Sequence, residues 1–139
     1  MKKRVLFLCT ANSCRSQMAE GITNHFWSDR LEAFSAGTNA SFVNPTAMEV
    51  LKEIGIDISK QHSKNLSEFD GQTFDYVITL CGDANETCPL YIAGMKKTHI
   101  GFDDPVKATG SNEEIVQEFR RVRDEIKMKL DEFFKHEKV

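Results

Sequence analysis

The sequence predicts a single α/β domain that spans residues 1–139. The domain should be a three-layer sandwich around a four-stranded parallel sheet. Strand-like apolar segments alternate along the chain with segments whose apolar residues recur at helical spacing. Chemically reactive side chains at Cys9, at Cys81 and at positions 103–104 each directly follow a strand-like segment. The carboxyl ends of parallel strands share one edge of a sheet, where ligands bind, so these side chains should meet there.

The first half of the chain supplies two strands and two helices. A run of four apolar residues at 5–8 predicts the first strand, and apolar residues spaced by four predict a helix from Ser16 to Trp27. Glu32 to Ala36 should be the second strand, closed by a glycine. Asn44 is a helix cap before a proline, so a second helix should run from there to Gly55.

The second half supplies two strands and the longest helix. Phe74 to Leu80 is a nearly continuous apolar run, typical of a parallel strand covered on both faces. Thr98 to Phe102 is a weaker candidate for the fourth strand. Apolar residues keep helical spacing from about Asn112 to Phe134, which predicts the last helix.

Composition excludes several classes of partner. The net charge of −3, from 18 basic and 21 acidic residues, gives no general attraction to nucleic acid or to a membrane surface, so any anion site must be local. The basic residues at 1–4 precede an apolar run too short for a signal peptide or a spanning helix, and we expect a cytoplasmic protein. In that reducing compartment, four cysteines are expected to be catalytic, redox-active or metal-binding.

The segment after the first strand has the pattern of an oxyanion site with a cysteine at its base. Cys9 is followed by five loop residues, then by Arg15 and a hydroxyl, between a strand and a helix. Backbone N–H groups of such a loop converge on one point and favour an anion. Arg15 offers a bidentate fork for a tetrahedral oxyanion, and its charge favours the thiolate form of Cys9. The expected binding and support residues are Thr10, Ala11, Asn12, Ser13, Cys14, Arg15 and Ser16.

Three of these loop residues are expected to support the site. Cys14 should be a packed, inert thiol whose side chain points away from the anion. Asn12 and Ser16 carry small hydrogen-bonding side chains suited to supporting the loop and the Cys9 sulfur, beside ordinary turn and cap roles.

A second pair of thiols, Cys81 and Cys88, brackets a stretch poor in large apolar residues. A continuous helix would separate their Cα atoms by about 10 Å, whereas a disulfide needs roughly 4.4–6.8 Å. A bond between them would therefore require a loop or local unwinding. Two unrelated buried cysteines remain the alternative, and a zinc site lacks the usual ligand spacing.

Asp103 and Asp104 precede Pro105, which biases Asp104 to an extended backbone. A carboxylic acid near a bound oxyanion could protonate a leaving oxygen. Because Asp-Pro is also a common turn, the residues alone leave a catalytic and a structural role open.

With these residues assembled, the chain resembles the thioredoxin-coupled arsenate reductases, a family with the low-molecular-weight protein tyrosine phosphatase fold. The similar segments extend from the first strand to the last helix: CTANSCRSQMAE at 9–20, TLCGD at 79–83, Cys88-Pro89, GFDDP at 101–105 and RVRDEI at 121–126.

The resemblance implies a function and a role for each site residue. Cys9 is then the nucleophile, Arg15 and the loop amides bind arsenate, and Asp104 is the general acid. Cys81 and Cys88 are the two further redox cysteines, whose final disulfide is reduced by thioredoxin. Phosphate or sulfate should compete for the loop, and we expect a monomer with no bound cofactor and no metal.

One residue departs from the family pattern. Some members bind potassium beside the loop, with ligands that correspond to Asn12, Glu20 and Ser35, and carry a carboxylate where this chain has Lys64. Because an ammonium group repels a cation, we expect no potassium site. Lys64 either supplies the ion's charge beside Glu20 or is solvated.

Two other functions remain open at this stage. A tyrosine phosphatase needs only Cys9, Arg15 and Asp104, but it does not require the second thiol pair, and Val106 stands where those enzymes commonly have an aromatic residue. A non-catalytic thiol redox sensor would leave the anion loop without a purpose. Binding of phosphate or arsenate discriminates between the sensor and the enzymes.

Overall fold

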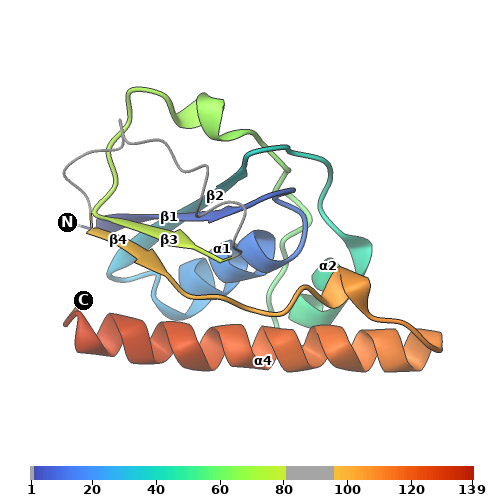
Figure 1. Ribbon diagram of the computed structural model, residues 1–139. Helices are drawn as coiled ribbons and strands as arrows, with labels where there is room; N and C mark the ends of the chain where they lie inside the picture. The colour runs from blue at the N-terminus through green and yellow to red at the C-terminus, as the bar shows by residue number, and fades with distance from the viewer. Residues whose placement is uncertain (1, 81–95) are drawn as a thin grey trace.

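The computed structural model describes residues 2–80 and 96–139, and Figure 1 shows the arrangement of their helices and strands. In chain order the elements are β1 (Lys3–Cys9), α1 (Arg15–Phe26), β2 (Leu31–Gly37), α2 (Pro45–Lys52), η1 (Leu66–Phe69), β3 (Tyr76–Thr79), β4 (Lys96–His99), η2 (Pro105–Lys107) and α4 (Asn112–His136).

The four strands form one parallel sheet in the order β2-β1-β3-β4, which confirms the predicted sheet. β1 is an interior strand because it pairs with β2 on one side and with β3 on the other. Its residues 5–9 are all buried, so both of its faces are covered. The register pairs Cys9, the last residue of β1, with Gly37, the last residue of β2. The segments that follow these two strands therefore leave the sheet at the same edge.

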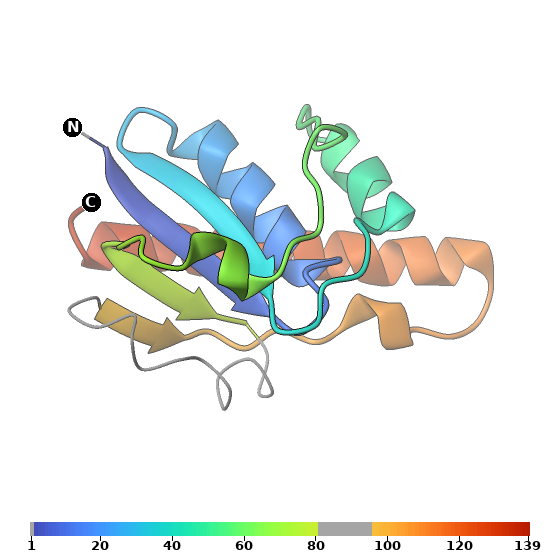
Figure 2. The same ribbon diagram turned by 90° about the horizontal axis from the view of Figure 1, so that it is seen from above.

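Two hydrophobic cores lie on opposite faces of the sheet, which gives the predicted three layers. Figures 1 and 2 show α1 and α4 on one face and the η1 segment on the other. The alternating side chains of β1 divide between these cores: Val5 and Phe7 enter the larger core with the helices. Leu6 and Leu8 enter the smaller one, next to an edge-to-face cluster of Phe34, Phe69 and Phe74.

The helix caps follow from the sequence. The Asn44 side chain accepts hydrogen bonds from the N–H groups of Thr46 and Ala47, with Pro45 at the first position of α2. Ser111 and Glu114 form a reciprocal capping box at the start of α4. Within residues 2–80 and 96–139, no helix is both long and apolar enough to cross a membrane.

The fourth strand is the main difference from the sequence prediction. It was expected at Thr98 to Phe102, and it lies at Lys96–His99, paired with β3. β4 is an edge strand whose two lysines are exposed, so apolar patterning gives no signal for it. The backbone continues to follow β3 beyond the strand, since the N–H of Ile100 bonds to Thr79 and that of Phe102 bonds to Leu80.

Other element boundaries differ by a few residues. α1 begins one residue earlier than predicted, at Arg15, and β3 is limited to Tyr76–Thr79. α2 ends at Lys52, and the chain then turns through Gly55, whose φ is +85°. The early start of α1 matters for the site, because it places Arg15 at the first position of the helix.

Candidate functional site

The loop between β1 and α1 brings the predicted thiol and guanidinium together. Cys9 is the last residue of β1 and is 3% exposed. Arg15 is the first residue of α1. Both line a cavity of about 230 Å³, together with Ala11, Ser13, Cys14, Ser41, Phe42, Asn44, Asp104 and Val106. The positive end of the α1 dipole therefore lies at this cavity.

Neighbouring segments hold the carbonyl groups of the loop. The contacts are from Asn39 N to Thr10 O (2.8 Å), from Ser63 Oγ to Ala11 O (2.9 Å), and from Asn44 N to Ser13 O (3.1 Å). Within a planar trans peptide, C=O and N–H point in opposite directions. The loop N–H groups therefore face away from these partners, as an anion-binding loop requires.

Ser16 and Asn12, the residues that the sequence suggested as supports for the Cys9 sulfur, lie next to it in the structure. The Ser16 Oγ lies 2.8 Å from the Cys9 Sγ, and Asn12 Nδ2 donates to Ser16 Oγ at 2.8 Å. All three residues are buried. Asn12 has a φ of +48°, in the left-handed region that asparagine tolerates better than most residues. A buried hydroxyl beside the sulfur stabilises its thiolate if the hydroxyl donates its proton to it.

Gly37 is a site residue that sequence reasoning missed. A Cβ atom at this position would lie 2.5 Å from Thr10 O and 2.9 Å from Asn12 N. From the sequence alone this glycine only ends a strand, whereas in the structure its missing side chain lets the loop pack against β2. A glycine at the carboxyl end of a strand adjacent to the loop is the signal that could have identified it.

Cys14 differs chemically from Cys9. It is 4% exposed, and burial raises the pKa of its thiol to about 12, with smaller contributions from the charges around it. The neutral thiol is thus the stable form at physiological pH, and a neutral thiol is a poor nucleophile. This agrees with the structural role expected for Cys14.

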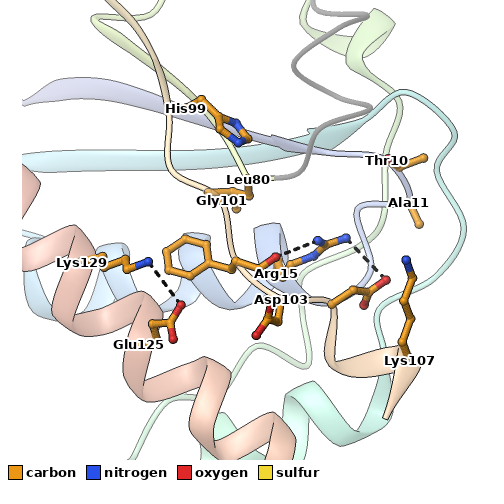
Figure 3. A pocket seen from close by; sticks show the side chains of 12 residues that line it. Thr10, Ala11, Arg15, Leu80, His99, Gly101, Asp103, Lys107, Glu125 and Lys129 are labelled. Atoms are coloured by element: carbon orange, nitrogen blue, oxygen red, sulfur yellow. Dashed lines mark hydrogen bonds and ion pairs between the residues drawn. The ribbon is translucent and has the colours of Figure 1, made fainter.

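A larger cavity of about 760 Å³ adjoins the first, because Ala11, Arg15 and Asp104 line both. The other residues that line the larger cavity are Thr10, Leu80, His99, Gly101, Phe102, Asp103, Lys107, Glu125 and Lys129. Figure 3 shows the Arg15 side chain in this cavity. Arg15 donates to Phe102 O at 3.2 Å and lies 3.6 Å from the Asp104 carboxylate. The arginine, the acid and the loop therefore share one solvent-accessible space.

The two aspartates have different surroundings. Asp104 has an extended backbone, accepts a hydrogen bond from the N–H of Val106 and directs its second oxygen toward Arg15. The Asp103 side chain is 79% exposed and forms an ion pair with Arg121 of α4 at 2.8 Å. Of the two carboxylates, Asp104 is thus the one that lies beside Arg15 and lines the cavity with Cys9.

Lys64 lies beside Glu20 and is largely shielded from solvent. Its Nζ is 3.6 Å from Glu20 Oε1, and the two side chains are 10% and 13% exposed. Lys64 Nζ also donates to His62 O at 3.0 Å, and Ser35 Oγ donates to Glu20 at 2.6 Å. The ammonium group thus balances the Glu20 carboxylate at the position where a cation was considered.

Two predicted site residues, Cys81 and Cys88, lie outside the described residues, so their approach to Cys9 stays a prediction. Leu80, the described residue that precedes Cys81 in the sequence, lines the larger cavity with Arg15. Among the described residues, no group of three or more His, Cys, Asp or Glu side chains is arranged to hold a metal ion.

Comparisons with known proteins show which family this chain resembles. The family model for low molecular weight phosphotyrosine protein phosphatases matches residues 4–139. The chain is 51% identical over 132 residues to an arsenate reductase of Shouchella clausii, covering 95% of both chains. It is 48% identical over 131 residues to an arsenate reductase of Bacillus subtilis, covering 94% of both.

Solved structures show the same relationship. An arsenate reductase in the phosphate binding state superposes with a TM-score of 0.83 at 33% identity, covering 98% of both chains. A low molecular weight protein tyrosine phosphatase from T. tengcongensis gives a TM-score of 0.77 at 28% identity, covering 97% of this chain and 99% of the other. The chain belongs to the low molecular weight phosphotyrosine protein phosphatase family.

Proposed function

We propose that this protein reduces arsenate to arsenite. One observation carries the proposal: the Cys9 thiol lies at the base of a loop shaped for a tetrahedral oxyanion, with Arg15 and Asp104 lining the same cavity. The relatives described above as arsenate reductases support the choice of arsenate over other oxyanions.

Arsenate would bind with its oxygens toward the loop N–H groups and the Arg15 guanidinium. The phosphate-bound state of a similar arsenate reductase supports this, since phosphate and arsenate are both tetrahedral oxyanions. Phosphate and sulfate would compete for the same donors. Arg15 supplies two parallel donors and a permanent positive charge, which a lysine cannot match in geometry.

In the first chemical step the Cys9 thiolate attacks the arsenic atom. The bond between arsenic and one of its hydroxyl groups breaks, and Asp104 protonates the departing hydroxyl, so that water leaves. The Ser16 hydroxyl and the positive end of α1 hold Cys9 ready for this attack.

The next steps use the second thiol pair. The Cys81 thiolate attacks the Cys9 sulfur, the sulfur–arsenic bond breaks, and its electron pair remains on arsenic, which leaves as arsenite. Cys88 then attacks Cys81 and releases Cys9 as a thiolate. The resulting Cys81–Cys88 disulfide is reduced by a dithiol, for which we propose thioredoxin in the cytoplasm, acting on a monomer with no bound cofactor.

Replacement of Asp104 by asparagine should slow arsenate consumption by about 10²–10⁴-fold, the usual contribution of a general acid. Thiol exchange with thioredoxin should change little, because only the first step needs this proton. Asp103→Asn is the matched control and should have a small effect, since Asp103 pairs with Arg121 at the surface. Pre-steady-state rates of both steps test this, and the opposite ranking of the two variants would assign the acid to Asp103.

A phosphatase is the second candidate, because the same three groups serve phosphoryl transfer and a tyrosine phosphatase shares the fold. The cavity that holds Cys9 has Phe42 and Val106 on its wall, both more than half exposed. Hydrolysis of an aryl phosphate without arsenate-dependent thiol oxidation would favour this function.

A coupled assay with thioredoxin, thioredoxin reductase, NADPH and arsenate tests the proposal. We expect NADPH oxidation that depends on both arsenate and thioredoxin, with one arsenite formed for each NADPH consumed. An NADPH signal without arsenite would contradict the proposal.

A further inference from the structure

A chain of hydrogen-bonded polar side chains connects Cys9 with the segment after α2, and all of its members except the half-buried Gln61 are buried. Its hydrogen bonds run from Gln61 Nε2 to Gln17 Oε1 (2.7 Å), from Gln17 Nε2 to Asn12 Oδ1 (2.9 Å) and from Asn12 Nδ2 to Ser16 Oγ (2.8 Å). Ser16 Oγ in turn lies within hydrogen-bond distance, 2.8 Å, of Cys9 Sγ. Gln17, Asn12 and Ser16 are each 0% exposed, so water does not replace these contacts.

A backbone N–H group fixes the orientation of the Asn12 amide. The N–H of Lys64, which can only donate, lies 2.9 Å from Asn12 Oδ1, so the Asn12 amide must turn its NH₂ group toward Ser16. Ser16 Oγ thus accepts from Asn12. Its single proton is then available for the Cys9 sulfur, which favours the thiolate.

The orientation of Gln17 is fixed in the same way. Gln17 Nε2 lies 3.0 Å from Asn12 O and 3.1 Å from His62 O, two carbonyl groups that can only accept. At its other end, Gln61 Nε2 donates to Gln17 Oε1 and to the Gln17 carbonyl. Gln17 is held with its NH₂ group against Asn12, where it contacts both the side chain and the main chain.

These contacts act on a residue with unfavourable backbone geometry. Asn12 has a φ of +48°, and Gln17 satisfies its carbonyl in that conformation. Without Gln17, the buried Asn12 carbonyl loses this donor, and the loop gains freedom to relax toward negative φ. Relaxation of Asn12 would withdraw its NH₂ group from Ser16 and leave the Ser16 proton undirected.

We infer that Gln17 is a positioning residue: it holds Asn12 so that Ser16 donates its proton to the Cys9 thiolate. Gln61 holds Gln17 in turn. This inference rests on the proposed role of Cys9 as nucleophile, and it adds to that role a residue that contacts neither the anion cavity nor the sulfur.

The test measures the reactivity of Cys9 as a function of pH. Full-length wild type, Gln17→Met, Gln61→Met and Gln117→Met proteins receive a short pulse of iodoacetamide at each pH, and peptide mass spectrometry quantifies alkylation of Cys9. Methionine keeps the side-chain length and removes the donor. Gln117 is exposed on α4 and is the matched control.

In Gln17→Met the midpoint of the alkylation curve should rise by about one pH unit, a tenfold loss of thiolate below the midpoint. Gln61→Met should shift the midpoint in the same direction by less, and Gln117→Met should match wild type. A merely structural role would lower thermal stability without moving the midpoint. If Gln17→Met does not fold, the Gln61→Met curve carries the test.

An unchanged midpoint in the folded Gln17→Met or Gln61→Met protein would overturn the inference. Alkylation needs no arsenate, so this result is separate from the coupled assay. Failure of wild type to reduce arsenate would contradict the proposed function and leave the positioning role of Gln17 measurable.

Discussion

Replacement of Cys9 by serine should abolish arsenate reduction, with a loss of about 10⁴-fold or more in turnover. Serine keeps the size of the side chain and can still sit at the base of the loop. Its hydroxyl does not ionise at neutral pH, and its oxygen cannot enter a disulfide relay. The fold and the binding of phosphate should survive, because the loop N–H groups and Arg15 are unchanged.

The assay measures arsenite formed by wild type and Cys9→Ser, with circular dichroism and phosphate binding as controls for folding. Cys14→Ser is the matched control and should keep most of its turnover. Burial raises the pKa of Cys14 to about 12, so iodoacetamide at pH 7–8 should label Cys9 well before Cys14. A Cys9→Ser protein with a substantial fraction of wild-type turnover would show that another thiol is the nucleophile.

Local sequence patterns predicted the strand, loop and helix that form the site because these elements depend on neighbouring residues. An apolar run, a polar loop and a helical repeat are contiguous, and they place Cys9 and Arg15 at the cavity without reference to the rest of the chain. The caps of α2 and α4 are local for the same reason.

Features that depend on distant segments were not predictable in this way. β4 has exposed lysines and is defined by its pairing with β3, so its position was misplaced by a few residues. The role of Gly37 arises from loop atoms more than twenty residues earlier in the chain. Gln17 forms hydrogen bonds with Gln61 and His62, and no repeat or motif in the sequence connects it with these two residues.

The placement of Lys64 lies between these cases. The resemblance suggested Glu20 as its partner, and the structure brings the two side chains to 3.6 Å. Its burial could not be deduced from the sequence, because lysine is an exposed residue in most contexts. Its side chain is only 10% exposed here because the Glu20 carboxylate and the His62 carbonyl pair with its ammonium group.

Replacement of Cys88 by serine should stop the enzyme after a single turnover. If Cys88 only resolves the Cys9–Cys81 disulfide, the variant can still carry out the attack of Cys9 on arsenate and the release of arsenite by Cys81. It would then remain trapped with Cys9 and Cys81 joined. A phosphatase would not stop in this way, because its cycle does not use Cys88.

Counting arsenite per enzyme therefore tests the proposed relay most directly. Reduced wild type and Cys88→Ser are mixed with excess arsenate, thioredoxin, thioredoxin reductase and NADPH, and the protein is then mapped by mass spectrometry. We expect continued arsenite formation by wild type, and about one arsenite per Cys88→Ser chain with a Cys9–Cys81 disulfide. Sustained thioredoxin-dependent turnover by Cys88→Ser, or a trapped disulfide that contains Cys14, would contradict the account.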